Sequence, residues 1–298
     1  MSAFRITAFY HFQALTEQQV QDLRKTLFDF GMEHNMRGLV LLATEGINGT
    51  VCGTPDVIEQ WKQLLRSYFP EINWKDSEAS ELVFPRWFVK IRAQIVGMRE
   101  GNAMPGREHS HISPEEWNKM MEEEDVVVID ARNVYETKIG MFDGAVDPKI
   151  RSFDEFATYV ATCNIPKDKK VLMYCTGGIR CERAIYEMEK QGYSHVYQLK
   201  GGILEYLKQC PNQKYKGECF VFDHRIAVDQ ELQPSKKYDA CPHCGDPGEL
   251  TVHCKECDSA CRICDVCSKE EEKNTCSKNC RYWLTHPERA PKKSLARK

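Results

Sequence analysis

The sequence predicts a mixed α/β protein with an α+β domain, then an α/β domain built on a parallel sheet, and then a cysteine-rich, metal-binding tail. Residues 1–100 alternate between strand and helix patterns. Continuous apolar runs at 126–129 and 171–174 are typical of parallel strands covered on both faces. Nine of the 15 cysteines lie between Cys241 and Cys280, which is the clearest change of composition along the chain.

Residues 1–100 are expected to form a ferredoxin-like domain with the order strand, helix, strand, strand, helix, strand. Thr16 and Gln19 have the spacing of a capping box at a helix start, and Gly31 is expected to close that helix. Two glycines around Asn48 predict a tight turn with positive φ, with a substrate-facing loop as the alternative. The expected elements are a strand over 4–12, a helix over 16–31, a strand over 39–43, a strand that begins at 50, a helix over 56–69 and a strand over 87–96.

A linker is expected over residues 101–114, and the second domain over residues 115–216. Because strands that alternate with helices favour a parallel sheet, the second domain is predicted to be α/β. Residues 217–298 form the cysteine-rich C-terminal region, whose basic end is expected to fray. The expected elements of the second domain are a helix that opens at 113–116, strands over 125–130, 171–174 and 195–199, and helices over 153–163 and 182–191.

The composition restricts the setting in which the protein works. A net charge of −3 and a pI of about 6.3 give no global sign of nucleic-acid binding, although a local basic patch would suffice. The N-terminus lacks the apolar segment of a signal peptide, and no apolar run approaches the roughly 20 residues of a membrane helix. The chain is therefore expected to be cytoplasmic and independent of a membrane, with cysteines that bind metal or react as thiols.

A candidate active-site loop follows the second apolar run and has the sequence Cys175-Thr176-Gly177-Gly178-Ile179-Arg180. A thiol at the carboxyl end of a strand faces the N-terminus of the next helix, where unpaired N–H groups and the helix dipole stabilise an anion. The two glycines allow the backbone to curl so that several N–H groups point inward, and Arg180 adds positive charge. The loop is therefore expected to lower the pKa of Cys175 and to hold a thiolate, a persulfide or an oxyanion.

Three further residues near this loop are candidates, each with a structural alternative. Cys181 is expected either to resolve a persulfide or disulfide on Cys175 or to begin the helix without chemistry. Asp130 and Arg132 are candidate catalytic residues, and the alternative is a buried ion pair that ties the sheet to the loop. For Cys175 itself the alternative is an inert cysteine at the end of a strand.

The loop and its surroundings resemble the rhodanese family. A cysteine opens a six-residue loop closed by arginine, Asp130-Ala131-Arg132 resembles the family's upstream motif, and Lys200-Gly201-Gly202-Ile203 resembles its glycine turn. Over residues 1–265 the chain is also similar to the tRNA uridine hydroxylase family, through Glu45-Gly46-Ile47-Asn48-Gly49-Thr50 in the first domain, the rhodanese loop and the cysteine-rich tail. That resemblance implies hydroxylation of the wobble uridine to 5-hydroxyuridine, with molecular oxygen as co-substrate and the tRNA anticodon loop as partner. It also matches Cys175 to the family's essential cysteine.

The sequence contains neither a His/His/carboxylate triad nor a dinucleotide fingerprint that would explain how oxygen is used. One hypothesis is that the thiolate or persulfide of Cys175 attacks carbon 6 of uracil and makes carbon 5 nucleophilic toward an oxygen species. A sulfurtransferase that carries sulfur as a Cys175 persulfide is the alternative enzyme. The alternative that is not an enzyme is a scaffold protein with a zinc-dependent tail.

Candidate RNA-binding residues lie on the last expected strand of the first domain. Arg86, Lys90 and Arg92 alternate with apolar residues, so that all three cations share one face and could bind phosphates. Arg107 in the linker could extend this strip. The alternative is a solvated polar face opposite the core.

The tail has the spacing of repeated metal-binding knuckles. Pairs of cysteines separated by two residues wrap two thiolates around one metal ion, and structural zinc is the expected metal. Two four-thiolate sites would use eight of the nine cysteines, with His243 and His253 as substitutes. An iron–sulfur cluster and disulfides are the alternatives. The candidate ligands are Cys241, Cys244, Cys254, Cys257, Cys261, Cys264, Cys267, Cys276 and Cys280.

Overall fold

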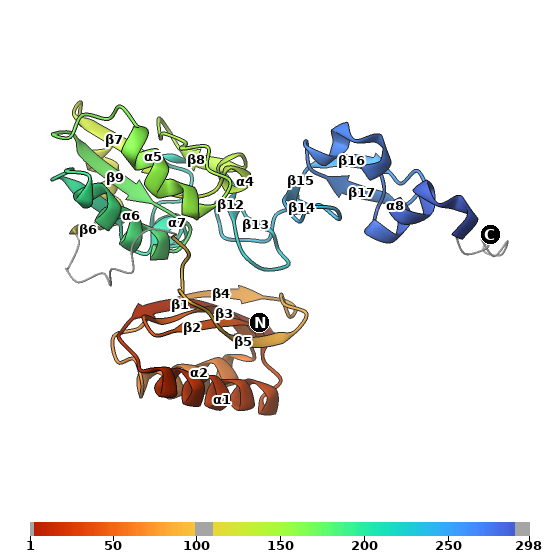
Figure 1. Cartoon of the computed structure of the whole chain (residues 1–298), viewed down its shortest axis with the longest axis horizontal. Coiled ribbons are helices and arrows are strands. Elements are labelled where there is room, and N and C mark those ends of the chain that lie inside the picture. Colours follow the sequence, from red (N-terminus) through yellow and green to blue (C-terminus); the bar gives the residue numbers. More distant parts are fainter. Residues whose placement is uncertain (1–2, 99–109, 290–298) are drawn as a thin grey trace. The chain divides into compact units, whose positions relative to one another are not determined.

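A computed structural model of the chain describes residues 3–98 and 110–289 (Figure 1). The chain divides into two compact units. The first unit consists of Met1–His224 with Val228–Gln233, and the second of Arg225–Ala227 with Pro234–Lys298. In the described part of the chain, no helix combines the length and apolar character needed to cross a bilayer.

The first unit begins with an α+β domain in which a five-stranded sheet has the order β4-β1-β3-β2-β5. Strands β4, β1, β3 and β2 form the ferredoxin-like arrangement that the sequence predicts, with antiparallel pairing throughout. Strand β5 adds to the edge, parallel to β2. The elements are β1 (Phe4–Phe12), α1 (Glu17–Glu33), β2 (Arg37–Ala43), β3 (Gly46–Gly53), α2 (Pro55–Arg66), β4 (Asn73–Ala79) and β5 (Trp87–Ile91).

The fourth strand of this domain lies earlier in the chain than predicted. The sequence placed it at 87–96, whereas β4 fills the fourth position and β5, which ends at Ile91, is an additional edge strand. The residues of β4 read NWKDSEA, and this polar sequence lacks the β-branched and aromatic enrichment that usually indicates a strand. Pairing with β1 stabilises β4 as a strand, although the sequence of β4 does not favour one.

Helix α1 begins as predicted but continues past the expected stop. The Thr16 hydroxyl accepts a hydrogen bond from the Gln19 N–H, and the Gln19 side chain accepts one from the Thr16 N–H, so the capping box is present. Gly31 lies inside the helix instead of ending it. A Cβ at this position would lie 2.1 Å from the Trp87 ring, so glycine serves close packing against β5.

The glycines around Asn48 belong to a strand rather than to a turn. The return strand begins at Gly46 instead of Thr50, and the turn of the hairpin is formed by Thr44 and Glu45. Gly46 does have the expected positive φ, 139°, and a Cβ there would lie 2.1 Å from the His11 carbonyl oxygen. The glycine is therefore required by close strand pairing.

Helices α1 and α2 cover one face of the sheet (Figure 1). A core of apolar side chains, including Phe9, Leu27 and Trp61, is buried between the helices and this face. Because side chains alternate along a strand, residues next to Phe9 in β1 point to the opposite face. Ala8 pairs directly with Lys75 of β4, which places both on that opposite face.

The second domain contains a parallel sheet with the order β6-β10-β9-β7. The three predicted strands are present, and β6 is a fourth strand within the segment expected to be a linker. Helix α6 starts three residues earlier than expected, directly after the glycines of the Cys175 loop. The elements are β6 (Ser110–Ile112), α3 (Pro114–Met120), β7 (Val126–Asp130), α4 (Val134–Thr137), β8 (Gly140–Phe142), η1 (Phe153–Glu155), α5 (Phe156–Thr162), β9 (Lys170–Tyr174), α6 (Ile179–Lys190), β10 (Val196–Leu199), α7 (Gly202–Gln209), β11 (Tyr215–Gly217), β12 (Cys219–Phe220) and β13 (Ala227–Val228).

The second unit contains short strands and one two-turn helix around the cysteines. Strand β16 pairs antiparallel with β17, and β14 pairs with β15. The elements are β14 (Asp239–Ala240), β15 (Pro247–Gly248), β16 (Leu250–His253), β17 (Ala260–Ile263), η2 (Cys267–Lys269), η3 (Glu271–Lys273), α8 (Lys278–Thr285) and η4 (Pro287–Arg289).

Candidate active site and metal-binding clusters

Cys175 lies at the carboxyl end of β9 and in front of the N-terminus of α6, as the sequence predicts. Its side chain is buried, with the residue 1% exposed. The Gly178 N–H donates a hydrogen bond to the Cys175 Sγ over 3.0 Å. Gly178 adopts a φ of 99°, which turns this N–H inward and favours glycine at the position.

The surroundings of Cys175 favour its thiolate. Burial alone would raise the pKa of the thiol, but the hydrogen bond from Cys181, the charge of Arg180 and the N–H groups of Arg180 and Gly178 together lower it to about 5. Burial and the neighbouring Cys175 raise the pKa of Cys181 well above its usual value. Cys181 is therefore a thiol that donates to a thiolate, a state suited to nucleophilic or persulfide chemistry on Cys175.

Arg180 is held in place by a carboxylate that the sequence reasoning missed. Its guanidinium donates to both oxygens of Glu136, over 2.5 and 2.7 Å, and Glu136 is fully buried. The Thr176 hydroxyl donates to the same carboxylate over 3.3 Å. Burial would raise the pKa of Glu136, but Arg180 outweighs it and lowers the pKa, so the pair is ionic. Asn133 and Glu136 form a capping box, and their spacing is the feature of the sequence that could have drawn attention to Glu136.

Asp130 and Arg132 form a separate ion pair under the loop. Both side chains are inaccessible to solvent, and Arg132 Nη2 lies 2.6 Å from an Asp130 carboxylate oxygen. The same nitrogen donates to the Gly140 carbonyl oxygen, and Nη1 donates to the Tyr215 hydroxyl. These contacts join β7 to β8 and β11, which favours the structural interpretation of this pair over the catalytic one.

The glycine turn at the start of α7 also supports the loop. The N–H groups of Ile203 and Leu204 donate to the carbonyl oxygens of Cys175 and Thr176, over 3.0 and 3.2 Å. Gly202 has a φ of 70°, and a Cβ there would lie 2.5 Å from the Cys175 carbonyl oxygen. The turn therefore fixes the backbone on which the thiol is mounted.

Residues of the first domain also contact the loop, and no local pattern in the sequence indicates them. The hydroxyl oxygen of Tyr10 would lie 3.0 Å from a Cβ at Gly178, and the Lys75 side chain lies near Gly177. Tyr10 donates to Glu182 of α6 over 2.9 Å. Glu45 forms an ion pair with Arg183 of the same helix. The motif that begins at Glu45 thus contacts the second domain.

Glu182 collects three hydrogen bonds at the start of α6. Its Oε1 contacts Tyr10 Oη, Gln198 Nε2 over 2.8 Å and His111 Nε2 over 3.1 Å. Burial would raise the pKa of Glu182, but the hydrogen bonds from His111 and Gln198 outweigh it and lower the pKa. This polar network joins β1, β6, β10 and α6 beside the loop.

The predicted RNA-binding residues of β5 share one exposed face. Arg86 and Arg92 are exposed, and Lys90 is half-buried with its ammonium 4.8 Å from the centre of the Phe88 ring. Phe88, which sequence reasoning assigned no role, is itself exposed on this face. Arg107 lies outside the described residues.

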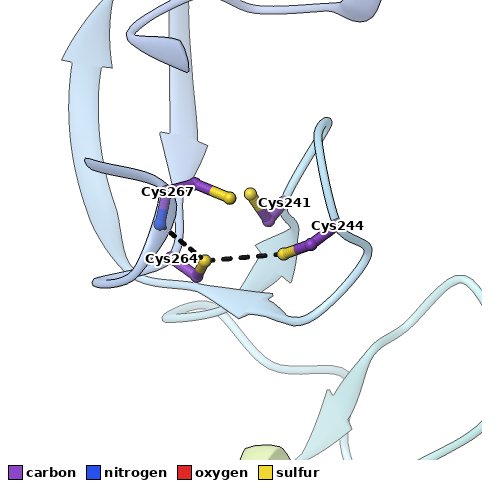
Figure 2. A group of neighbouring side chains, drawn as sticks. All are labelled: Cys241, Cys244, Cys264 and Cys267. Carbon is purple, nitrogen blue, oxygen red and sulfur yellow. Dashed lines mark hydrogen bonds between the residues drawn. The ribbon is translucent and has the colours of Figure 1, made fainter. Parts of the chain in front are cut away.

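Eight of the nine tail cysteines form two sets of four. In each set the sulfur atoms lie within 4.8 Å of one another. Figure 2 shows Cys241, Cys244, Cys264 and Cys267 pointing toward a common centre. The second set consists of Cys254, Cys257, Cys276 and Cys280.

The two sets interleave along the chain, because the first pair joins the third and the second joins the fourth. Separations of 3.5 Å between Cys244 and Cys264 and of 3.9 Å between Cys257 and Cys280 fit a tetrahedral zinc site, in which sulfurs lie about 3.8 Å apart. Cys261 belongs to neither set, nor do His243 and His253, so these three are not ligands in either group. The donor sets fit a thiolate-bound metal.

The parallel sheet and the thiol-bearing loop define a rhodanese-like domain. A family model described as a rhodanese-like domain matches residues 113–209. A model described as the UPF0176 acylphosphatase-like domain matches residues 4–95, and one described as rhodanase C-terminal matches residues 216–281.

Curated relatives match nearly the whole chain. A tRNA uridine(34) hydroxylase from Bdellovibrio bacteriovorus is 49% identical, over 98% of this chain and 85% of its own length. Proteins of the same name from Teredinibacter turnerae and Bartonella bacilliformis are 42% and 39% identical, over 83% and 89% of this chain and 78% and 88% of their own lengths. The chain belongs to the tRNA uridine(34) hydroxylase family, which confirms the family indicated by the sequence.

Proposed function

We infer that this protein hydroxylates uridine 34 of tRNA at carbon 5, with Cys175 as the nucleophile and molecular oxygen as co-substrate. The observation that carries the proposal is family membership over 98% of the chain, in a protein whose rhodanese loop is intact. The stabilised Cys175 thiolate supports the assignment of the nucleophile. Because the substrate is tRNA, the protein is proposed to act in the cytoplasm on the anticodon loop.

The proposed chemistry begins with addition of the Cys175 thiolate to carbon 6 of uracil. A carbon–sulfur bond forms, and the electrons of the 5,6 double bond move toward oxygen 4 as an enolate, which makes carbon 5 nucleophilic. Carbon 5 then gains one atom of molecular oxygen. The other oxygen atom leaves as water with two electrons from an external thiol reductant. Loss of the proton on carbon 5 expels the thiolate and restores the double bond.

Uridine 34 must turn out of the anticodon loop to reach Cys175, and the RNA around it must be held by a binding surface. Strand β5 is proposed to supply this surface. Arg86, Lys90 and Arg92 would bind phosphates, and the exposed Phe88 ring offers a surface on which a base can stack. An aromatic side chain among cations is typical of surfaces that bind single-stranded RNA. Arg107 is retained as a candidate that extends this surface.

The cysteine-rich region is proposed to bind two structural zinc ions. Cys241, Cys244, Cys264 and Cys267 would hold one ion, and Cys254, Cys257, Cys276 and Cys280 the other. Zinc would neutralise the thiolates and link distant parts of a unit that has few apolar residues in its core. An iron–sulfur cluster is the alternative occupant of the same ligands.

The proposed function is tested by mass spectrometry of tRNA nucleosides from cells that lack this protein. Complementation with the wild type is expected to restore 5-hydroxyuridine and its derivatives, and Cys175→Ser is expected not to. A Lys119→Ala variant, altered on the exposed surface of α3, serves as a matched control and should complement fully. An unchanged oxygen modification together with a missing thiolated nucleoside would instead establish a sulfurtransferase, the activity favoured by the rhodanese loop alone.

A further inference from the structure

Lys75 of the first domain extends to the Cys175 loop of the second. It lies on β4, on the sheet face opposite α1 and α2. Its Cδ and Cε atoms would lie 3.7 and 3.8 Å from a Cβ at Gly177. The residue is only 8% exposed. A lysine side chain from one domain is therefore buried against the loop that carries the thiol of the other.

The Lys75 ammonium has no hydrogen bond or ion pair with any residue in 3–98 or 110–289. The ammonium lies over the face of the Tyr10 ring, with Nζ 4.7 Å from the ring centre. Burying an ammonium without an anionic partner is costly, so such a group usually faces an anion. Arg180 differs, because it forms an ion pair with Glu136.

We propose that Lys75 is a positioning residue whose ammonium is the counter-ion of the Cys175 thiolate, so that the first domain completes the active site. This inference rests on the proposed function only in taking Cys175 as the reactive thiol. An opposite charge nearby stabilises a thiolate. Arg180 contributes to this stabilisation although it is paired with Glu136, and Lys75 adds a second positive charge. The uridine-modifying chemistry would then depend on contact between the two domains of the first unit.

Several other titratable groups lie around this pair. Glu182, Arg180 and Cys181 approach from α6, Tyr10 from β1, and Glu205 and Lys208 from α7. Burial lowers the pKa of Lys75 to about 8, against the opposing charges of Cys175, Glu182 and Glu205. With Cys175 ionised above about pH 5, the ion pair is complete between about pH 5 and 8.

The inference is tested by titrating the ultraviolet absorbance of the Cys175 thiolate, taken as the difference between wild-type protein and Cys175→Ser. Lys75→Met is expected to raise the midpoint of this titration by about 1 pH unit, because one neighbouring positive charge is removed. Lys75→Arg should restore the wild-type midpoint. Lys62→Met is the matched control, since Lys62 is also buried in the first domain but pairs with Asp76. An unchanged midpoint in folded Lys75→Met would overturn the proposal.

A reciprocal measurement leaves Lys75 in place. Because coupling between two titrating groups is mutual, Cys175→Ser should lower the pKa of Lys75 by the amount that Lys75→Met raises that of Cys175. Nuclear magnetic resonance of lysine labelled at Cε measures this value directly, and an unaltered Lys75 titration would contradict the proposal even if Lys75→Met did not fold. Neither titration contains tRNA, so failure of hydroxylation and failure of this ion pair give separate results.

Discussion

At the scale of single residues, the guanidinium of Arg180 is held by one buried carboxylate, that of Glu136. Glu136→Gln would leave the guanidinium buried without an ionic partner and would weaken the cap of α4. Breaking a buried pair in this way typically costs about 3–5 kcal/mol of unfolding free energy. Urea unfolding of the variant checks the value. Asp125→Asn, which removes an exposed partner of Lys169, is the control and should leave the urea midpoint unchanged.

The ionised state of Cys175 also predicts a pH dependence of stability. Its pKa in the folded protein, about 5, lies below the value of about 8.5 expected for an unfolded chain. Between these values the unfolded chain binds one more proton, so this residue stabilises the fold increasingly as pH rises. The contribution is complete above about pH 8.5 and is lost as pH falls through about 5.

Unfolding of the wild type and of Cys175→Ser at a series of pH values measures this contribution as the difference between their free energies. The difference should grow in favour of the wild type as pH rises across that window. A difference that stays constant with pH would show that folding does not lower the pKa of Cys175.

The residues around Cys175 differ in how well the sequence predicts them. Cys175, its two glycines and Arg180 lie within six consecutive residues, so their shared geometry could be predicted from the order of strand, loop and helix. Glu136 and Lys75 reach the loop from about 40 and about 100 residues away. Only tertiary packing brings them there. No local pattern indicates Lys75, and the capping-box spacing of Glu136 does not indicate its contact with Arg180.

At the scale of secondary-structure elements, β5 is the proposed tRNA-binding strand. Replacing Arg86 and Arg92 by alanine is expected to weaken tRNA binding and to reduce the slope of log affinity against log salt by about 1 for each phosphate that is no longer bound. Phe88→Ala should weaken binding with little change in that slope, because stacking does not release counterions. Filter binding over a range of salt concentrations measures both quantities. Equal affinities and slopes for all variants would assign tRNA binding to another surface.

Strands with strong apolar patterns were predicted at nearly their observed bounds, as for β1 and β7. Among the strands that were not predicted, β4 is polar and β6 is only three residues long, and both are ordered by their partner strands, β1 and β10. Gly31 misled the prediction of a helix end because its role is packing against Trp87. The predicted element boundaries were wrong where tertiary contacts, rather than local preference, decide the backbone conformation.

At the scale of the whole molecule, the second unit is expected to depend on metal. Metal analysis should give two zinc ions per chain, one for each set of four cysteines. Cys244→Ser should remove one ion, whereas Cys261→Ser, the matched control outside both sets, should keep both. Loss of zinc from Cys261→Ser would contradict the ligand assignment. Iron and inorganic sulfide in place of zinc would assign a cluster instead.

The two units are expected to differ in how strongly their folding depends on metal. Because the loop and its contacts lie in the first unit, chelation of the metal should unfold the second unit before the first. Circular dichroism of the intact chain with increasing chelator would then show a partial loss of structure. A single loss of all structure would show that the two units fold cooperatively.

The transfer of an oxygen atom to uridine 34, with Cys175 as the nucleophile, can be measured directly. Purified full-length protein, incubated with unmodified tRNA, a thiol reductant and isotopically labelled molecular oxygen, should yield 5-hydroxyuridine that carries the label at position 34. Cys175→Ser should yield none, while Lys119→Ala should match the wild type. A product that carries sulfur would contradict oxygen transfer, and labelled product formed equally well by Cys175→Ser would contradict the role of Cys175.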